Sequence, residues 1–303
     1  MNYVLQTNQL SKNFSGKMAV DNVSLNVKKG DIYGFIGQNG AGKTTLMRMV
    51  CGLASPTSGE ISLYGSSNLT KQRRKMGAAI ENPALYPTMT AMENMEAQRL
   101  MLGIKNKKEC AELLELVGIA DTGKKKAKDF SLGMKQRLML ALSLMGSPEF
   151  LVLDEPTNGL DPLGIKETLE FIQKLNKTKG ITILVSSHIL GELEKIATRY
   201  GVIHHGKMVD EFSADELLVR CGENLLINTN DPQKAEQVIK EMLSNAQISH
   251  TPENGIRIKG YINDAGRINQ ALVESGIIVN ALIPEGERLE DYFLKLMGGV
   301  ANA

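Results

Sequence analysis

The chain has 303 residues, of which 42% are hydrophobic and 23% are charged, so it can bury a sizeable core and divide into two domains. A formal net charge of +1 gives no electrostatic reason to expect nucleic acid or an anionic membrane surface as a partner. Three widely separated cysteines, Cys51, Cys110 and Cys221, form no CxxC pair, which indicates a reducing compartment. The N-terminus does not resemble a signal peptide, and no apolar run reaches the ~18–20 residues that span a bilayer. We therefore expect a cytoplasmic protein that reaches a membrane only through a partner.

The first 52 residues predict a layer of strands that leads into a glycine loop and a helix. Residues 1–30 alternate weakly between apolar and polar side chains around a Ser-Gly-Lys turn, which predicts an antiparallel hairpin. Residues 31–37 are a short apolar run that ends in glycine, and residues 41–52 have helical spacing. Strand, glycine loop and helix in this order are typical of a phosphate-binding site.

The middle of the chain predicts further strands with a helix between them. Residues 149–156 and 181–188 are short apolar runs rich in leucine and β-branched residues. Residues 162–180 lie between them and read as an amphipathic helix that Gly180 closes. Apolar strands that alternate with helices indicate a parallel sheet covered on both faces.

A helical insertion is expected between the glycine loop and the strand at 149–156. Residues 90–146 are mostly helical in pattern, and Thr90 with Glu93 fits the capping box that starts a helix. We expect a helical subdomain at about residues 83–147, inserted into an α/β domain that spans residues 1–215.

The character of the chain changes after residues 200–212, which read as a hairpin that turns at His205–Gly206. Residues 222–303 predict a small accessory α+β domain, whose strand-helix-strand-strand-helix-strand order is ferredoxin-like. The expected strands are 224–228, 247–250, 255–259 and 277–282, and the expected helices are 232–243, 264–275 and a final one at 289–297.

The sequence GQNGAGKTT at residues 37–45 matches the pattern G-x-x-x-x-G-K-[ST] of a phosphate-binding loop. Its glycines let backbone N–H groups curl around a phosphate, while Lys43 reaches the outer phosphates and the Thr44 hydroxyl ligates Mg²⁺. A strand before the loop and a helix after it make a chance match improbable. The predicted nucleotide-binding residues of this loop are Gly37, Gln38, Asn39, Gly40, Ala41, Gly42, Lys43, Thr44 and Thr45.

The sequence FLVLDEP at residues 150–156 supplies the second anchor for the metal. Four apolar residues bury the strand, and Asp154 follows at its carboxyl end, where α/β sheets bind ligands. Asp154 would hold Mg²⁺ through water, and Glu155 could polarise an attacking water. The alternative is a pair of surface carboxylates at the end of a strand.

Five motifs in one order identify a resemblance: GQNGAGKTT, SLGMKQR, LVLDEP, NGLD and SSH. Their order and spacing resemble those of ABC-transporter ATP-binding subunits, over residues 1 to about 212. The resemblance implies a P-loop ATPase that binds ATP and Mg²⁺ and powers transport through a separate membrane permease. It also implies that two ATPase domains pair head to tail, so that each ATP lies between two chains.

SLGMK stands where these proteins have LSGGQ, the turn that covers the γ-phosphate of the partner chain. The resemblance therefore assigns Ser131, Leu132, Gly133 and Met134 to a site completed in trans, although Leu132, Met134 and Lys135 depart from the consensus. A helix N-terminus with a hydroxyl and backbone donors suits an anion. The alternative is that Ser131 serves only as a helix cap.

The resemblance also assigns roles to Phe14, His188 and Asp161. Phe14 resembles the aromatic residue that stacks on adenine, with an ordinary core phenylalanine as the alternative. His188, at the end of SSH, resembles the histidine that contacts the γ-phosphate and acts with Glu155 in catalysis. Asp161, in NGLD, resembles the aspartate that bridges the dimer.

One departure points to a branch of these transporters. They normally have a glutamine after the strand that precedes the helical insertion, and here Glu81 holds that place. The glutamine ligates Mg²⁺, and a carboxylate binds Mg²⁺ more strongly than an amide does. Glu81 and the C-terminal extension resemble ATPases that export lantibiotics and bacitracin as immunity or resistance devices.

Three other functions are alternatives. The first is another P-loop enzyme, a kinase or a GTPase, and a GTPase should carry an N/T-K-x-D guanine-reading stretch, which this sequence lacks. A non-transport ABC ATPase of translation or DNA repair should carry two cassettes or a long coiled-coil insertion, and this chain has one uninterrupted cassette. A regulatory module with a dead site would not keep Lys43, Asp154, Glu155 and His188. A non-transport or regulatory ABC ATPase that acts on another macromolecule stays as the alternative.

Overall fold

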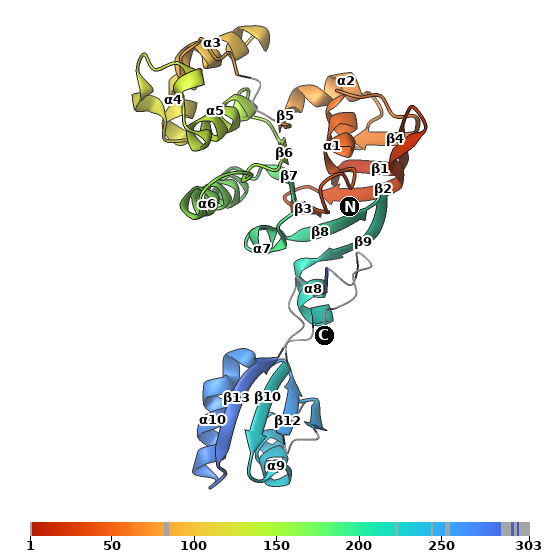
Figure 1. The fold of residues 1–303 in the computed structure, drawn as a ribbon, viewed down its shortest axis with the longest axis vertical. Coiled ribbons are helices and arrows are strands. Elements are labelled where there is room, and N and C mark those ends of the chain that lie inside the picture. Colours follow the sequence, from red (N-terminus) through yellow and green to blue (C-terminus); the bar gives the residue numbers. More distant parts are fainter. Residues whose placement is uncertain are drawn as a thin grey trace. The chain divides into compact units, whose positions relative to one another are not determined.

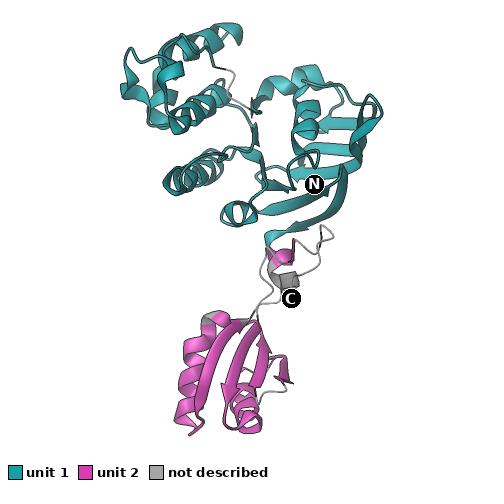
Figure 2. Ribbon diagram, viewed as in Figure 1, with its two compact units in different colours: residues 1–214 teal, residues 215–303 magenta. Residues whose placement is uncertain are grey.

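A computed structural model of the chain describes residues 2–81, 85–221, 224–243, 245–251 and 255–285, together with residues 292, 293 and 296. The chain divides into two compact units, Met1–Ala214 and Asp215–Ala303 (Figure 2). Over these described ranges, every helix is too short or too polar to cross a membrane. The final helix expected at 289–297 falls mostly outside the described residues.

The first unit contains two sheets. A three-stranded antiparallel sheet has the order β2-β1-β4, and a six-stranded sheet has the order β5-β6-β7-β3-β8-β9 (Figure 1). The neighbours from β5 to β8 pair in parallel, and β9 closes the larger sheet as an antiparallel edge strand. The strands are β1 (Tyr3–Phe14), β2 (Lys17–Lys28), β3 (Ile32–Ile36), β4 (Ser58–Leu63), β5 (Met76–Ala79), β6 (Phe150–Asp154), β7 (Thr182–Ser187), β8 (Arg199–His204) and β9 (Lys207–Ser213).

The helices of this unit follow the strands as the sequence predicted. Helix α6 begins after its cap Asp161 and ends before Gly180, whose φ of 64° confirms the predicted glycine stop. The hairpin of β8 and β9 turns at His205–Gly206, also as predicted. The helices are α1 (Lys43–Cys51), α2 (Leu69–Gln72), α3 (Ala91–Met101), α4 (Lys108–Leu116), α5 (Leu132–Leu144), α6 (Pro162–Lys179) and α7 (Leu190–Leu193), with 3-10 turns at Arg73–Lys75, Ala120–Thr122 and Ala127–Asp129.

Helix α1 lies between the two sheets of the first unit. Its buried residues Leu46 and Val50 share one hydrophobic cluster with Leu5 of β1 and Phe35 of β3. The strands β3, β6 and β7 are buried along their whole length, because both of their faces are covered. This packing fixes the start of α1 against the carboxyl ends of the central strands.

Helices α3, α4 and α5 form the helical subdomain, which Figure 1 shows grouped apart from the two sheets. The predicted capping box starts α3: the Thr90 hydroxyl accepts from the Glu93 N–H at 3.2 Å, and the Thr90 N–H donates to the Glu93 carboxylate at 2.6 Å. Residues 82–84, which enter the expected insertion, lie outside the described residues.

The second unit contains a four-stranded antiparallel sheet of order β11-β12-β10-β13. Alternate residues of its strands, such as Ile227 and Ile256, pack with Ile239 of α9 and Leu272 of α10 in one cluster, so both helices cover the same face. The observed element order agrees with the predicted one. The elements are α8 (Ala214–Cys221), β10 (Asn224–Thr229), α9 (Pro232–Met242), β11 (Ile248–Thr251), β12 (Gly255–Lys259), α10 (Ala265–Glu274) and β13 (Val279–Glu285), with a 3-10 turn at Ile262–Asp264.

Candidate nucleotide-binding site

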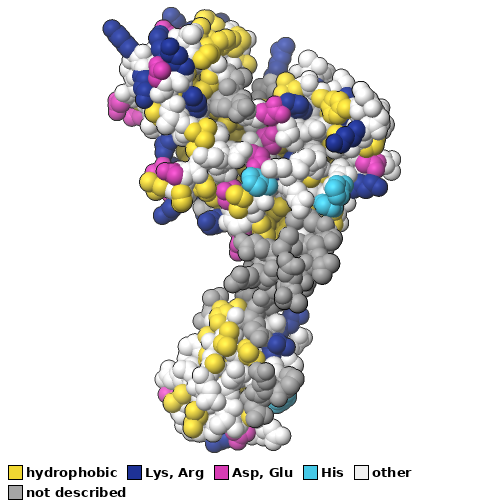
Figure 3. Space-filling view, viewed as in Figure 1, with side chains coloured by type: hydrophobic (Ala, Val, Ile, Leu, Met, Phe, Trp, Pro, Cys, Tyr) yellow, Lys and Arg dark blue, Asp and Glu magenta, His cyan; other side chains and the backbone are white. Residues whose placement is uncertain are grey.

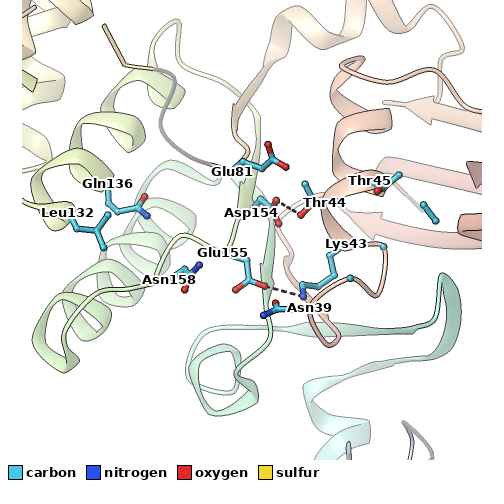
Figure 4. Close-up of a pocket in the computed structure, with 13 residues that line it drawn as sticks. Asn39, Lys43, Thr44, Thr45, Glu81, Leu132, Gln136, Asp154, Glu155 and Asn158 are labelled. Carbon is cyan, nitrogen blue, oxygen red and sulfur yellow. Dashed lines mark hydrogen bonds and ion pairs between the residues drawn. The ribbon is translucent and has the colours of Figure 1, made fainter. Parts of the chain in front are cut away.

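A cavity of about 570 Å³ lies where the loop after β3 meets the carboxyl end of β6 (Figure 4). The glycine loop and the start of α1 supply much of its wall, and the acidic end of β6 supplies another part. Helix α5 reaches it from the far side. Its lining includes Asn39, Gly40, Gly42, Lys43, Thr44 and Thr45 of the glycine loop and the start of α1. Glu81, which follows β5, and Asp154 and Glu155, at the end of β6, also line it.

Glycine is required at two positions of the loop. A side chain at Gly37 would place its Cβ 2.5 Å from the carbonyl oxygen of Ile203, on the neighbouring strand β8. Gly42 has a φ of 112°, and a Cβ there would lie 2.5 Å from the carbonyl oxygen of Ala19. The tight loop therefore delivers the chain directly to the N-terminus of α1, where unpaired N–H groups favour an anion.

The Lys43 side chain is buried, and acceptors surround its ammonium group. Its Nζ donates to the carbonyl oxygens of Gly37 at 2.6 Å and Gln38 at 3.2 Å. It also forms an ion pair with Oε1 of Glu155 at 3.1 Å. Phosphate oxygens offer the same kind of contact, so this arrangement holds a positive charge ready for a phosphate chain.

Thr44 and Asp154 meet as the sequence predicted. The Thr44 hydroxyl donates to Oδ2 of Asp154 at 2.7 Å. The other carboxylate oxygen of Asp154 accepts from the Ser186 hydroxyl at 2.6 Å, and that hydroxyl accepts from the N–H of Glu155 at 2.9 Å. Ser186, on the adjacent strand β7, therefore fixes both acidic residues, and the sequence analysis did not single it out.

The donor set of this site fits Mg²⁺. Hydroxyl and carboxylate oxygens are hard ligands, and Mg²⁺ usually takes one or two carboxylates and completes its shell with water and substrate phosphates. Within the described ranges, no group of three or more His, Cys, Asp or Glu side chains could hold a metal by itself. A metal at Thr44 and Asp154 would thus depend on the phosphates of a bound nucleotide.

Glu155 and His188 are in direct contact. The Nδ1 atom of His188 lies 2.5 Å from Oε2 of Glu155, while the other carboxylate oxygen faces Lys43. Glu155 has a φ of 50°, a left-handed conformation that non-glycine residues rarely adopt and that is often found at functional sites. The sequence-predicted pair is thus assembled within one chain.

Glu81 lines the cavity, but its carboxylate is paired with Arg48 of α1. Arg48 Nη2 lies 2.5 Å from Glu81 Oε2, and the two side chains are 41% and 50% exposed. In Figure 4 the Glu81 carboxylate is turned away from Asp154. Glu81 therefore lies at the predicted site, and its contact with Mg²⁺ stays a prediction.

The turn at 131–134 lies at the start of α5 and packs on the NGLD turn. Ser131 is exposed, and its hydroxyl accepts from the Met134 N–H at 3.3 Å, so it caps α5. Leu132 lies so close to Gly159 that a Cβ at that glycine would be 2.8 Å from it. Leu132 lines the cavity, whereas Ser131, Gly133 and Met134 do not.

Phe14 and Asp161 do not line the cavity of this chain. Phe14 ends β1 with 48% of its surface exposed, and the Lys12 ammonium lies 4.9 Å from its ring centroid. The alternative of an ordinary core phenylalanine is therefore wrong, and stacking on adenine stays a prediction. Asp161 accepts from the Gly164 N–H at 2.8 Å as the cap of α6, and its dimer contact stays a prediction.

Comparison with known proteins identifies relatives of this chain. A family model described as "ABC transporter" matches residues 20–158. The chain is 41% identical to the bacitracin transport ATP-binding protein BcrA of Bacillus licheniformis over 99% of both chains. It is 44% identical to the lantibiotic transport ATP-binding protein SrtF of Streptococcus pyogenes, over 74% of this chain and 98% of SrtF. A solved dimeric ATP-binding cassette in a post-hydrolysis state, bound to ADP and phosphate, superposes with a TM-score of 0.64 at 26% identity, over 69% of this chain and 98% of that one.

Proposed function

Since the chain belongs to the ATP-binding subunits of ABC transporters, we propose that its ATPase activity drives a separate membrane permease that exports peptide antibiotics. The similarity to the bacitracin transport protein runs over 99% of both chains and so includes the second unit. Glu81, in place of the usual glutamine, supports the same branch. Export of bacitracin- or lantibiotic-type peptides would give the cell immunity or resistance to them.

The observation that carries the proposal is the cluster of Lys43, Glu155 and His188 at the mouth of the glycine loop. Lys43 would exchange its carbonyl and carboxylate acceptors for the β- and γ-phosphates of ATP. Glu155, released from Lys43, would orient and deprotonate the attacking water, while His188 keeps its other oxygen in place.

Thr44, Asp154 and Glu81 are the proposed magnesium ligands. Bound Mg²⁺ would neutralise the charge that develops on the transferred phosphoryl group. Thr44 and Asp154 are already in hydrogen-bond contact, so they would present a hydroxyl oxygen and a carboxylate oxygen to a cation side by side. Glu81 is held at the rim of the same cavity by Arg48.

A second copy of the chain, or a homologous ATPase, would complete each site. Ser131 is exposed at the start of α5 and does not line the cavity of its own chain. In a head-to-tail dimer, this helix N-terminus would cover the γ-phosphate bound by the partner. Asp161, which starts α6 beside the same turn, would bridge the two chains.

A groove of about 370 Å³ between β5 and the helical subdomain is the proposed permease surface. Apolar side chains such as Leu53, Leu85 and Leu102 line it, and Leu53, Leu100 and Met101 are each more than 60% exposed. Figure 3 shows hydrophobic side chains gathered on one side of the helical subdomain. An exposed apolar patch of this kind is typical of a protein interface, and it would hold the chain at the inner face of the membrane.

Purification from a detergent extract tests the proposal. The tagged chain should bring down a membrane protein in stoichiometric amount, and addition of bacitracin or a lantibiotic should raise the ATPase rate of the complex. Leu53→Glu and Leu102→Glu, which change two exposed side chains of the groove, should abolish the co-purification without lowering the ATPase rate of the isolated chain. Recovery of a soluble partner in place of a membrane protein would favour the alternative, a non-transport or regulatory ABC ATPase.

A further inference from the structure

A buried carboxylate near the site has no role in the chemistry described so far. Glu192, in α7, is only 6% exposed, and its Oε2 atom accepts two hydrogen bonds from hydroxyl groups. One comes from Thr157 at 2.7 Å, and the other comes from Ser187 at 3.0 Å. These two hydroxyl donors offset the cost of burying the carboxylate.

The two hydroxyl groups sit on the two segments that carry the catalytic pair. Thr157 follows Glu155 by two residues, at the turn that leaves β6. Ser187 directly precedes His188, and its hydroxyl also accepts from the Ile189 N–H at 2.9 Å, which fixes its position. Glu192 therefore links the segment after Glu155 to the segment around His188.

Ser186, which precedes Ser187 in β7, links the same strand to Asp154 and to the Glu155 N–H. Ser186 donates to Asp154 and accepts from the Glu155 N–H. Ser186 thus holds the chain at the Glu155 N–H. Ser187 holds it two residues further on, at Thr157, through the shared partner Glu192. The left-handed φ of Glu155 needs support of this kind, because the surrounding structure must stabilise a sparsely populated conformation.

A buried carboxylate is a costly way to fill this position if stability is the only requirement. An apolar side chain of similar size often stabilises a core as well as a buried charge does, or better. A carboxylate offers something that an apolar residue cannot, because a single oxygen accepts charge-assisted hydrogen bonds from two separate segments.

We propose that Glu192 is a positioning residue, which sets Glu155 and His188 relative to each other through Thr157 and Ser187. The inference rests on the proposed roles of Glu155 and His188 in ATP hydrolysis. Glu192 does not line the nucleotide cavity. Its effect is exerted on the orientation of the base, and a misplacement of about 1 Å can cost on the order of 10² in rate.

Matched substitutions in the full-length chain separate positioning from packing. Thr157→Val removes the hydroxyl at nearly constant volume, while Thr157→Ser keeps it. Glu192→Met removes both acceptor contacts, while Glu192→Gln keeps an acceptor oxygen. We expect Thr157→Val and Glu192→Met to lower kcat by about 10- to 100-fold. The affinity for a fluorescent ATP analogue should change less than about twofold, because the phosphate contacts of Lys43 remain. Thr157→Ser and Glu192→Gln should retain most of the rate.

Amide hydrogen exchange on the nucleotide-free chain gives a second readout that does not depend on ATPase activity. Thr157→Val and Glu192→Met should speed exchange in residues 155–159 and 186–190 while the sheet of the first unit keeps its protection. The double variant should be no slower in turnover than Glu192→Met alone, since both remove the same link.

Wild-type kcat in folded Thr157→Val and Glu192→Met would overturn the inference and leave Glu192 as a packing residue. Uniformly faster exchange throughout the first unit would overturn it as well. If Glu155→Gln also left kcat unchanged, the proposed role of Glu155 in catalysis would fail. Faster hydrogen exchange confined to residues 155–159 and 186–190 would still support the link that Glu192 makes between these two segments.

Discussion

Replacement of Glu155 by glutamine removes the carboxylate from the centre of the site while keeping its shape. The amide cannot accept the proton of an attacking water, so we expect kcat to fall by roughly 10²–10⁴, the usual scale for a general base. The substitution also removes the ion pair with Lys43, in which the two side chains are only 5% and 18% exposed. His188 loses its charged partner at the same time.

The cost to stability should be tolerable. Coulomb's law with an effective dielectric constant of about 20 gives roughly 5 kcal/mol for the attraction of Lys43 and Glu155 at 3.1 Å. Desolvation of the two groups offsets much of that attraction, and Lys43 keeps the carbonyl oxygens of Gly37 and Gln38. Removal of one partner of a buried ion pair costs about 3–5 kcal/mol, and we expect a loss near the lower end of that range and a folded protein. ATP affinity should be retained or increased, because Lys43 no longer has to leave a carboxylate.

The assay combines ATPase rates with sedimentation in the presence of Mg-ATP. Glu155→Gln should hydrolyse ATP slowly and accumulate as a dimer, since the nucleotide is bound and not consumed. Glu149→Gln is a matched control, because Glu149 precedes β6 at its opposite end, is 52% exposed and pairs only loosely with Lys75. Near-normal turnover by Glu155→Gln, or an equal loss in Glu149→Gln, would refute the assignment of the base.

Three further outcomes are expected. Lys43→Ala should weaken ATP binding by about 10- to 100-fold, because a charge-assisted contact is lost, and unchanged affinity by calorimetry would contradict the glycine-loop assignment. Glu81→Gln should raise the Mg²⁺ concentration needed for nucleotide binding. Arg48→Met should lower that concentration about 1.5- to 5-fold, because it frees the Glu81 carboxylate. Identical Mg²⁺ titrations of the wild type and both variants would argue against Glu81 as a ligand. Mixed dimers of Ser131→Arg and Lys43→Ala subunits should recover ATPase activity that neither homodimer has, because one composite site stays intact. Efficient dimerisation without recovery would count against the trans role of Ser131.

The central elements of the site could be predicted from the sequence because local pattern and function coincide there. The glycines of residues 37–42 and the fully apolar strands before Lys43 and Asp154 leave few alternatives to a phosphate-binding loop on a parallel sheet. The contact of Thr44 with Asp154, across 110 positions of sequence, follows because β3, which leads into α1, and β6 run parallel in one sheet with β7 between them, so that their carboxyl ends share one edge.

The supporting contacts could not be predicted, because they depend on which polar side chains turn inward. Glu192 belongs to a four-residue helix and looks in sequence like a solvated surface glutamate. Its buried neighbours Leu190 and Leu193 were the only local signal. The pair of Arg48 with Glu81 joins a helix face to a loop, and no periodicity in the sequence relates the two.

Strand boundaries were less predictable than strand existence. The last strand of the second unit was expected at 277–282 and is observed at Val279–Glu285, because Pro284 occupies the exposed end of an edge strand, where a missing N–H is tolerated. Roles that need a second chain, such as those of Ser131 and Asp161, lie beyond the contacts of a single chain.

The most direct test of the account measures resistance to peptide antibiotics in cells. Deletion of the gene should lower the concentration of bacitracin or of a lantibiotic that stops growth. A plasmid copy of the wild-type gene should restore it, while an equally expressed Glu155→Gln copy should not. Unchanged sensitivity after deletion, or equal rescue by both copies, would contradict the claim that ATP hydrolysis at Glu155 powers the export of these peptides.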